Sequence, residues 1–201
     1  MPLSRCPWAE SLPLLRAFHD HEWGDPVSDP AILFEYLVLH SFQIGFDFPV
    51  VLSRREGFRE LLAGFDPARL ARFTDGEVDE LLQNPRIIRN RRKLQATVRN
   101  AQAWLRLRRE LGTDAALLAF FYAFVGGYPQ DAARAAGPLP LRTPASEAMS
   151  KDLKRRGFAM LGPATCYSLM QTAGLVNDHL RTCPRHAECQ QLAAQWQPPT
   201  Q

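Results

Sequence analysis

The chain has few of the features that mark secreted, membrane or disulfide-rich proteins. It contains four cysteines among 201 residues, too few for a disulfide scaffold in a chain of this length. No apolar run approaches the roughly 18–20 residues that span a bilayer, and residues 1–11 lack the apolar segment of a signal peptide. We therefore expect a protein of the reducing cytoplasm with no membrane contact, where cysteine beside histidine more often indicates a metal than a disulfide.

Strand signals are scarce too, because no stretch alternates apolar and polar residues with β-branched enrichment. Helix starts are marked by a capping residue before proline, or by a capping box, at Asp29-Pro30, Asp66-Pro67, Asn84-Pro85 and Thr74-Asp75-Gly76-Glu77. The helix that starts at Asn84-Pro85 would end at Gly112, and the apolar stretch 31–39 predicts a central buried helix. We expect one all-α domain over residues 1–201, with 185–201 a partly ordered tail.

Charge is unevenly distributed, although the net charge is only +3. No acidic residue occurs between Pro85 and Arg109, a stretch that contains Arg86, Arg89, Arg91, Arg92, Lys93, Arg99, Arg106, Arg108 and Arg109. A second basic cluster consists of Lys151, Lys154, Arg155 and Arg156. Either cluster alone is equally well explained as a solvated helix face. Their distribution indicates a polyanionic partner more strongly than the net charge does, since Lys and Arg bind phosphates regardless of sequence.

Cysteine and histidine occur together near both ends of the chain. Cys6 and His19 lie near the start, and His179 and Cys183 near the end. The i, i+4 spacing of the second pair predicts two side chains on one helix face. Two thiolates and two imidazoles suit a closed tetrahedral zinc site, which would tie the two ends of the chain together.

Spacing alone leaves other metal ligands open. His21, His186 and Cys189 could each substitute for one member of the set. His21 could equally be a surface residue, and the other two could belong to a loose tail. Cys166 lies in an apolar helical stretch, where a buried small hydrophobe is the expected role.

Residues 150–165 are typical of two helices joined by a short turn. The first helix ends on Lys154 and Arg155, whose charges suit its negative dipole end. Gly157 allows the left-handed position after a helix, and Gly162 allows close approach of a ligand before a second helix starts. Free N–H groups at that helix start can bind a phosphate. The candidate DNA-binding residues are Lys154, Arg155, Gly157, Gly162 and Thr165, although an ordinary αα-turn has the same pattern.

Taken together, these motifs resemble the bacterial 3-methyladenine DNA glycosylase I family, within the helix-hairpin-helix DNA glycosylase superfamily. The resemblance extends from Arg5 to Cys183, and the segments that carry it are residues 18–24, 87–94, 150–158, 166–171 and 174–179. It implies an all-α helix-hairpin-helix glycosylase fold. It also implies a structural Zn²⁺ bound by Cys6, His19, His179 and Cys183.

The chain departs from the family at the base pocket. The family has Tyr before the first zinc histidine, where this chain has Phe18. Its glutamate and tryptophan positions are occupied here by His40 and Phe48. The resemblance makes these residues substrate-binding candidates, with His40 also a catalytic candidate unless it is a satisfied core histidine. Asp47 is a second catalytic candidate, as a replacement carboxylate, although an exposed or capping role is the simpler reading.

The resemblance implies hydrolysis of the N-glycosidic bond of alkylated purines, with 3-methyladenine the default substrate, in double-stranded DNA. Glycosylases that also cut the strand place a Lys near the start of the second hairpin helix. Residues 162–165 contain none, so we expect a monofunctional enzyme that uses water as nucleophile. We also expect a monomer that uses no nucleotide cofactor. Asp178 is the nearest candidate for the superfamily's catalytic Asp. A protein that binds lesions or abasic DNA without efficient hydrolysis, and a sequence-preferring DNA-binding regulator, are the alternatives.

Overall fold

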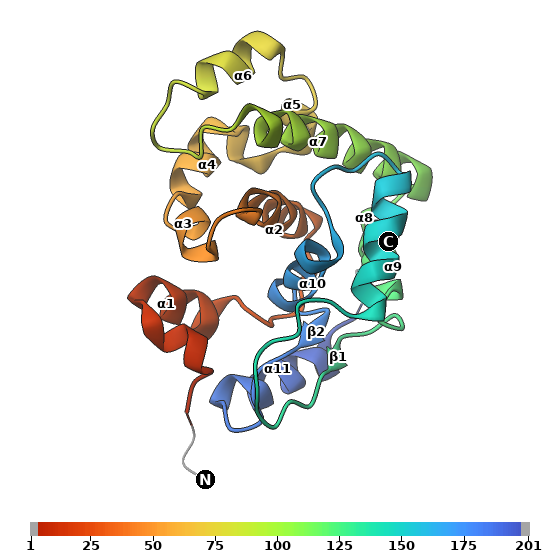
Figure 1. Cartoon of the computed structure of the whole chain (residues 1–201). Helices are drawn as coiled ribbons and strands as arrows, with labels where there is room; N and C mark the ends of the chain where they lie inside the picture. The colour runs from red at the N-terminus through yellow and green to blue at the C-terminus, as the bar shows by residue number, and fades with distance from the viewer. Residues whose placement is uncertain (1–3, 198–201) are drawn as a thin grey trace.

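The computed structural model describes residues 4–197 and is built almost entirely of helices (Figure 1). The elements in chain order are η1 Pro7–Ser11, α1 Pro13–His21, α2 Pro30–Gln43, α3 Phe48–Leu52, α4 Arg55–Leu61, η2 Ala63–Phe65, α5 Pro67–Leu70, α6 Asp75–Leu81, α7 Arg91–Leu111, α8 Asp114–Ala123, β1 Gln130–Asp131, α9 Pro144–Arg155, α10 Pro163–Thr172, β2 Val176–Asn177 and α11 Pro184–Gln195. The expected all-α class is confirmed, because the strands β1 and β2 form only one short parallel pair.

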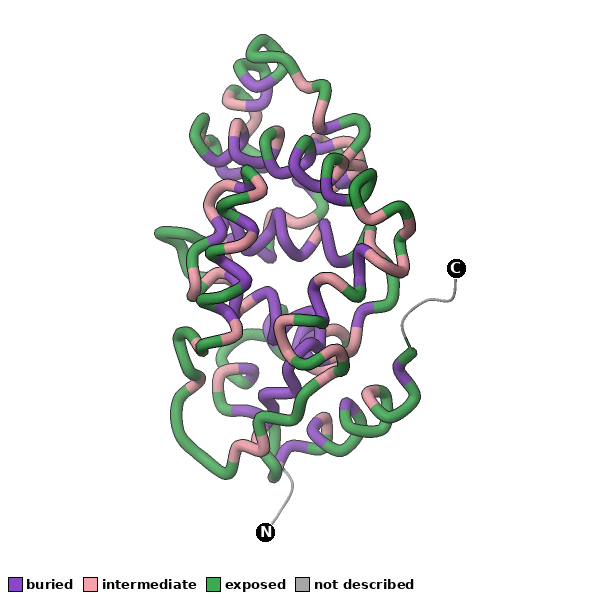
Figure 2. The backbone as a smooth tube through the Cα atoms, turned by 90° about the vertical axis from the view of Figure 1, so that its right-hand side faces the viewer, coloured by how far each residue is buried: buried purple, intermediate pink, exposed green. Residues whose placement is uncertain are grey.

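Helix α2 lies at the centre of the fold. It is apolar nearly all round, and Leu33, Phe34, Leu37 and Leu39 are fully buried. Helices α3, α7, α8 and α10 pack against it, and Figure 2 shows the buried residues concentrated there. Local capping starts α2 as expected, since the Asp29 side chain accepts a hydrogen bond from the Ala31 N–H.

The predicted helix start at Asn84-Pro85 is wrong. The Asn84 side chain instead closes a turn by accepting from the Arg86 N–H. Ile87 and Ile88 then bury their side chains in the core, which holds this segment out of a helix. Helix α7 begins only at Arg91, where Asn90 is the N-cap, and it ends before Gly112 as expected.

Two expectations about the C-terminal segment also differ from the structure. Residues 184–195 form the helix α11, where a partly ordered tail was expected from residue 185, and Trp196 packs on Tyr122 with ring centroids 4.0 Å apart. His179 and Cys183 lie in the turn between β2 and α11, not on a helix. Pro184 explains this, since a residue before proline is disfavoured in a helix. Residues 198–201 lie outside the described residues.

The segment that leaves α1 passes tightly against the end of α10. Gly174 has φ +65°, and a Cβ placed there would lie 2.3 Å from the carbonyl carbon of Asp25. The Val27 N–H donates to the Ala173 carbonyl at 3.0 Å. No side chain fits between these two backbones. None of the described helices combines the length and hydropathy needed to cross a membrane.

We predict that Gly174→Ala lowers the free energy of unfolding by about 3 kcal/mol or more, because it adds a steric overlap to the strain of a positive φ. Gly112→Ala is the matched control, since Gly112 has φ +86° with open space around it, and should cost about 1 kcal/mol. Urea unfolding measures both variants. Equal losses would show that the close approach at Gly174 does not matter.

Candidate functional site

A cavity of about 250 Å³ opens where α1, α2, α3 and α10 meet. Its lining is mostly aromatic and apolar, with a few neutral polar groups. The lining residues are Trp8, Leu15, Phe18, Trp23, His40, Gln43, Phe48, Pro49, Leu139, Ser168, Gln171 and Thr172. Phe18, His40 and Phe48, the expected substrate-binding residues, therefore line one cavity. None of these lining residues carries a carboxylate.

Aromatic rings form most of the cavity wall. Phe18 and Phe48 have ring centroids 5.2 Å apart, and His40 stacks on Phe48 at 4.8 Å with an interplanar angle of 14°. Trp8 and Trp23 meet edge to face at 5.0 Å. Such faces attract a flat ring by stacking and a cationic ring by cation–π contact.

His40 is buried at the end of α2 and hydrogen-bonded at both ring nitrogens. Its Nδ1 lies 2.9 Å from Gln43 Oε1 and its Nε2 lies 2.8 Å from Thr172 Oγ1. Burial lowers the pKa of His40 to about 4, so the imidazole is neutral near pH 7. A neutral ring that donates to Gln43 then accepts from the Thr172 hydroxyl. His40 thereby joins α2 to α10 across the cavity.

Asp178 and Asp47, the other carboxylates considered from sequence, do not line the cavity. Asp178 is fully buried and accepts hydrogen bonds from the Tyr167 hydroxyl and the Gln171 amide, each at 2.7 Å. It therefore orients Gln171, which does line the cavity. Asp47 is exposed at the N-cap position of α3, without a side-chain capping bond. Its position gives no support to its expected role as a replacement carboxylate.

A second group of side chains lies next to the cavity, where the two ends of the chain meet. The potential ligand atoms of Cys6, His19, His179 and Cys183 all lie within 4.8 Å of one another, and all four residues are buried. Cys183 Sγ is 3.5 Å from His19 Nε2 and 3.7 Å from His179 Nδ1. Cys6 Sγ is also 3.7 Å from His179 Nδ1. The sequence-predicted set is thus brought together, and this cluster could hold a metal ion.

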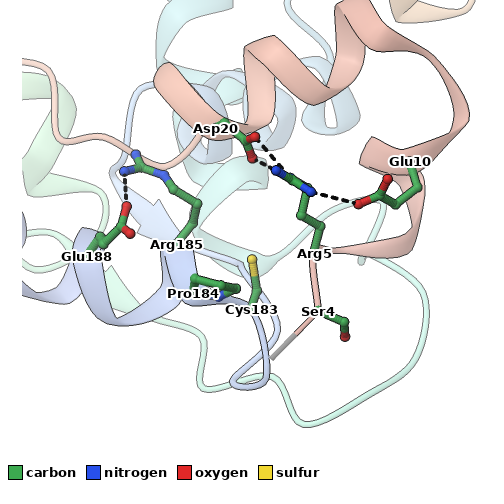
Figure 3. A pocket seen from close by; sticks show the side chains of 8 residues that line it. All are labelled: Ser4, Arg5, Glu10, Asp20, Cys183, Pro184, Arg185 and Glu188. Atoms are coloured by element: carbon green, nitrogen blue, oxygen red, sulfur yellow. Dashed lines mark hydrogen bonds and ion pairs between the residues drawn. The ribbon is translucent and has the colours of Figure 1, made fainter. Parts of the chain in front are cut away.

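The groups around the cluster orient its ligands. His19 Nδ1 donates to Asp20 at 2.8 Å, which leaves Nε2 facing the cluster. Asp20 in turn accepts from Arg5, and Figure 3 shows this pair above Cys183 in a shared surface pocket. His179 Nε2 donates to the Trp23 carbonyl at 2.9 Å. A hydrogen bond from Cys6 lowers the pKa of Cys183 most strongly, and His179 and His19 lower it further.

The alternative ligands lie outside this cluster. His21 is exposed, His186 bonds to Asp131 at 3.0 Å, and Cys189 contacts Asp25 at 3.5 Å. Cys166 is fully buried in α10, as expected of a small hydrophobe.

The turn between α9 and α10 has the geometry expected of the hairpin. Gly157 has φ +91°, and the N–H groups of Gly157 and Phe158 donate to the carbonyls of Lys154 and Leu153, which is a Schellman motif. Phe158 is buried beneath the turn. Gly162 is the N-cap of α10, and a Cβ there would meet no atom within 4 Å.

The predicted phosphate-contacting residues lie around this turn. Lys154, Arg155, Gly157 and Gly162 are exposed, and Thr165 is partly exposed. The Arg155 guanidinium is paired with Asp152. Among the ion pairs of residues 4–197 none involves Lys154.

Sequence reasoning missed several residues of the site. Trp8, Gln43, Gln171 and Thr172 line the cavity but carry no local motif that predicts it. For Gln43, the signal was its position, which is three residues after His40 and hence on the same helix face. Gln171 and Thr172 could be found only by knowing that α10 packs against α2.

Comparisons with known proteins agree with this arrangement. The family model described as methyladenine glycosylase matches residues 8–186. The chain is 40% identical over 182 residues to "DNA-3-methyladenine glycosylase 1" of Escherichia coli, covering 90% of this chain and 96% of that protein. It is 40% identical over 184 residues to "DNA-3-methyladenine glycosylase" of Haemophilus influenzae, covering 90% and 97%.

Solved structures are similar over nearly their full length. A crystal structure of 3-methyladenine DNA glycosylase I matches with a TM-score of 0.85 and 44% identity, covering 90% of this chain and 98% of that one. A Tyr-to-Phe variant of such an enzyme, in complex with 3-methyladenine, matches with a TM-score of 0.84 and 34% identity, covering 89% and 95%. The fold, the family model and these relatives together show that the chain belongs to the methyladenine glycosylase family.

Proposed function

We propose that this protein is a monofunctional DNA glycosylase that hydrolyses the N-glycosidic bond of alkylated purines, with 3-methyladenine the default substrate. The observation that carries this proposal is the aromatic cavity at the end of α10, the helix that begins at the α9–α10 hairpin, in a chain of this family. The cavity can take a flat base, and the hairpin can hold the DNA backbone. A Tyr-to-Phe variant of one structural relative was crystallised in complex with 3-methyladenine, which supports 3-methyladenine as the base that this protein takes.

The target base must leave the helix stack to enter such a cavity. A base methylated at N3 carries a positive charge and is already a good leaving group, so little acid catalysis is needed. The rings of Trp8, Phe18, Trp23 and Phe48 supply attraction for that charge by cation–π contact. The hydroxyl and amide groups of the lining offer hydrogen-bond partners to the edge of the base.

His40 serves this pocket as a positioning residue rather than as an acid or a base. Its neutral ring is occupied by Gln43 and Thr172, both of which line the cavity. It therefore presents their amide and hydroxyl groups to the base at a fixed orientation. We propose this role in place of the catalytic role expected from sequence. Asp47 does not line the cavity, so we propose no catalytic role for it. Water is the nucleophile, since the start of α10 carries no Lys.

The DNA partner is bound around the hairpin. Lys154, Arg155 and Thr165 would contact phosphates, and Gly157 and Gly162 let the backbone approach them closely. We propose that the enzyme acts in the cytoplasm as a monomer on double-stranded DNA, without a nucleotide cofactor.

The buried Cys/His cluster fits a structural Zn²⁺. Zinc lies about 2.3 Å from sulfur and about 2.0–2.1 Å from nitrogen in tetrahedral sites, which places sulfur and nitrogen about 3.6 Å apart. The sulfur–nitrogen distances of 3.5–3.7 Å agree with this. Both imidazoles also donate their other N–H to oxygen, as metal-bound histidines usually do. Zinc here would supply structure, because the four side chains fill all the positions of a tetrahedral site.

The departures of the pocket from its family favour one second candidate, a protein that binds lesions without efficient hydrolysis. The carboxylate that the family has at the position of His40 is missing. The cavity should therefore attract a cationic base more weakly. Both candidates require the same cavity and hairpin, so only the appearance of free base separates them.

Base release from methylated duplex DNA tests the proposed function. We expect free 3-methyladenine to appear in excess over other methylated purines, measured by chromatography of the released bases. A Phe18→Ala and Phe48→Ala double variant should release at least about fivefold less, since it removes stacking worth about 1–3 kcal/mol. If the protein binds methylated DNA selectively but releases no free base, the second candidate, a protein that binds lesions without efficient hydrolysis, is favoured. If it prefers one DNA sequence and binds methylated and unmethylated DNA equally, a DNA-binding regulator is favoured.

We predict that Cys183→Ser lowers the zinc content from about one ion per chain to a small fraction and lowers the unfolding temperature. Elemental analysis of the purified protein measures the metal. Cys189→Ser is the matched control, because Cys189 is equally buried but lies outside the cluster, and it should keep its zinc. Full zinc in the Cys183 variant, or equal loss in the control, would contradict the proposed ligand set.

The buried His40 makes stability depend on pH. Its folded-state pKa of about 4 lies below the unfolded value of about 6.5, so the unfolded chain binds the extra proton between these values. Stability due to this residue is therefore present above about pH 6.5 and is lost as the pH falls toward 4, by about 3 kcal/mol in total. Unfolding of the wild type and of His40→Gln across this range measures it. Parallel pH profiles for the two proteins would show that His40 is not held neutral.

A further inference from the structure

Helix α7 contacts both parts of the site through two buried polar side chains. Lys93 and Asn100 lie two helical turns apart, on one face of the helix. Both are almost wholly buried, with 4% and 0% of their surface exposed. Neither lines the cavity, and sequence patterning placed Lys93 among the surface basic residues.

Lys93 holds the segment that follows α2. Its ammonium group donates to the carbonyl of Phe42 at 2.6 Å and to that of Ile44, at the negative end of the α2 dipole. It also lies 4.4 Å from the centroid of the Phe46 ring. These contacts flank Gln43 on both sides and precede Phe48, and both of these residues line the cavity.

Asn100 holds the turn between α9 and α10. Its Nδ2 donates to the Ala159 carbonyl at 3.1 Å, and its Oδ1 accepts from the Ala159 N–H at 2.7 Å. The next residue, Met160, has φ +57°, a conformation that costs a side-chain-bearing residue free energy and persists only where its surroundings hold it. Ser150 adds a bond to the Leu161 carbonyl at 2.7 Å. Figure 1 shows this turn arching toward α7.

The hydrogen bonds of both side chains are made to backbone atoms, at the end of α2 and the residues that follow it for Lys93 and in the α9–α10 turn for Asn100. A side chain that binds backbone atoms fixes where the loop lies, whatever side chains the loop carries. The segment after α2 and the α9–α10 turn share no hydrogen bond among the described residues. Helix α10 links the two sites directly, since it starts at the hairpin and lines the cavity near its end. Helix α7 is a second support, because its buried side chains bind both segments. A flipped base and its flanking phosphate are a fixed distance apart, and the enzyme gains from having its two binding parts preset to that distance.

We propose that Lys93 and Asn100 are positioning residues through which α7 sets the spacing between the base cavity and the hairpin. This inference rests on the proposed function, because it assumes that the cavity takes the base and the hairpin takes the backbone. The two residues act on different binding events. Lys93 fixes the cavity wall, and Asn100 fixes the phosphate-binding turn.

The test compares two affinities in each variant. One probe is free 3-methyladenine, whose binding is followed through the fluorescence of Trp8 and Trp23. The other is duplex DNA with a tetrahydrofuran abasic analogue. Asn100→Leu should weaken duplex binding about tenfold, the loss of one paired hydrogen-bond contact, and leave free-base binding unchanged. Lys93→Met should weaken free-base binding by about the same factor.

Thr97→Val is the matched control. Thr97 is buried between the two residues on α7, and its hydroxyl bonds only to the Lys93 carbonyl within the helix. It should change neither affinity. Asn100→Asp keeps the acceptor for the Ala159 N–H and should fall between the wild type and Asn100→Leu. If Asn100→Leu does not fold, the duplex affinity of Asn100→Asp tests the role of Asn100 in its place.

Two results would overturn the proposal. One is an Asn100 variant that weakens both affinities equally, as general loosening would. The other is an Asn100 or Lys93 variant whose affinities match those of the Thr97 control. Failure of the wild-type protein to bind or release 3-methyladenine would instead refute the proposed function. The duplex affinities of the Asn100 variants would still show whether Asn100 positions the hairpin.

Discussion

The burial of most of α2 is the constraint on which the rest of the structure depends. A helix that is apolar over most of its surface is stable only where other elements cover it, so the chain must pack around it. Helices α3, α7, α8 and α10 provide this cover. Apart from Glu35, the strongly polar residues of α2 lie near its C-terminal end, at His40, Ser41 and Gln43. The polar end of an otherwise apolar helix therefore coincides with the cavity.

The cavity also depends on how the N-terminal helix is held. Phe18 lines the cavity, and its neighbour His19 belongs to the Cys/His cluster. One short helix thus links the position of the cavity wall to the cluster that joins the chain ends. Gly24 and Gly174 allow the connecting segment to pass without side chains in the way. A change that moves His19 would therefore also move Phe18, the preceding residue of α1, and so alter the cavity wall.

Local rules predicted the parts of the fold that are locally determined. The caps at Asp29, Asp66 and Thr74 start helices as expected, because each is a contact between residues two or three positions apart. Asn84-Pro85 failed because burial of Ile87 and Ile88 outweighed a capping signal. The resemblance placed Phe18, His40 and Phe48 near one another, and the structure puts them in one cavity. Sequence patterns could not predict the roles of four other residues, because their contacts join segments that are distant in sequence. These residues are Lys93, Asn100, Gln171 and Thr172.

The absence of a carboxylate from the cavity lining has a consequence after the bond has broken. Cleavage converts a cationic base into a neutral one, so a pocket that held its substrate by an opposite charge would lose that attraction on cleavage. Aromatic faces lose the cation–π part of their attraction as well, but they keep the stacking part for the neutral ring. The excised base should then leave slowly, and turnover would be limited by its departure and slowed by added free base. In a cavity lined by aromatic rings, tight binding of the damaged base and rapid release of the excised base therefore oppose each other.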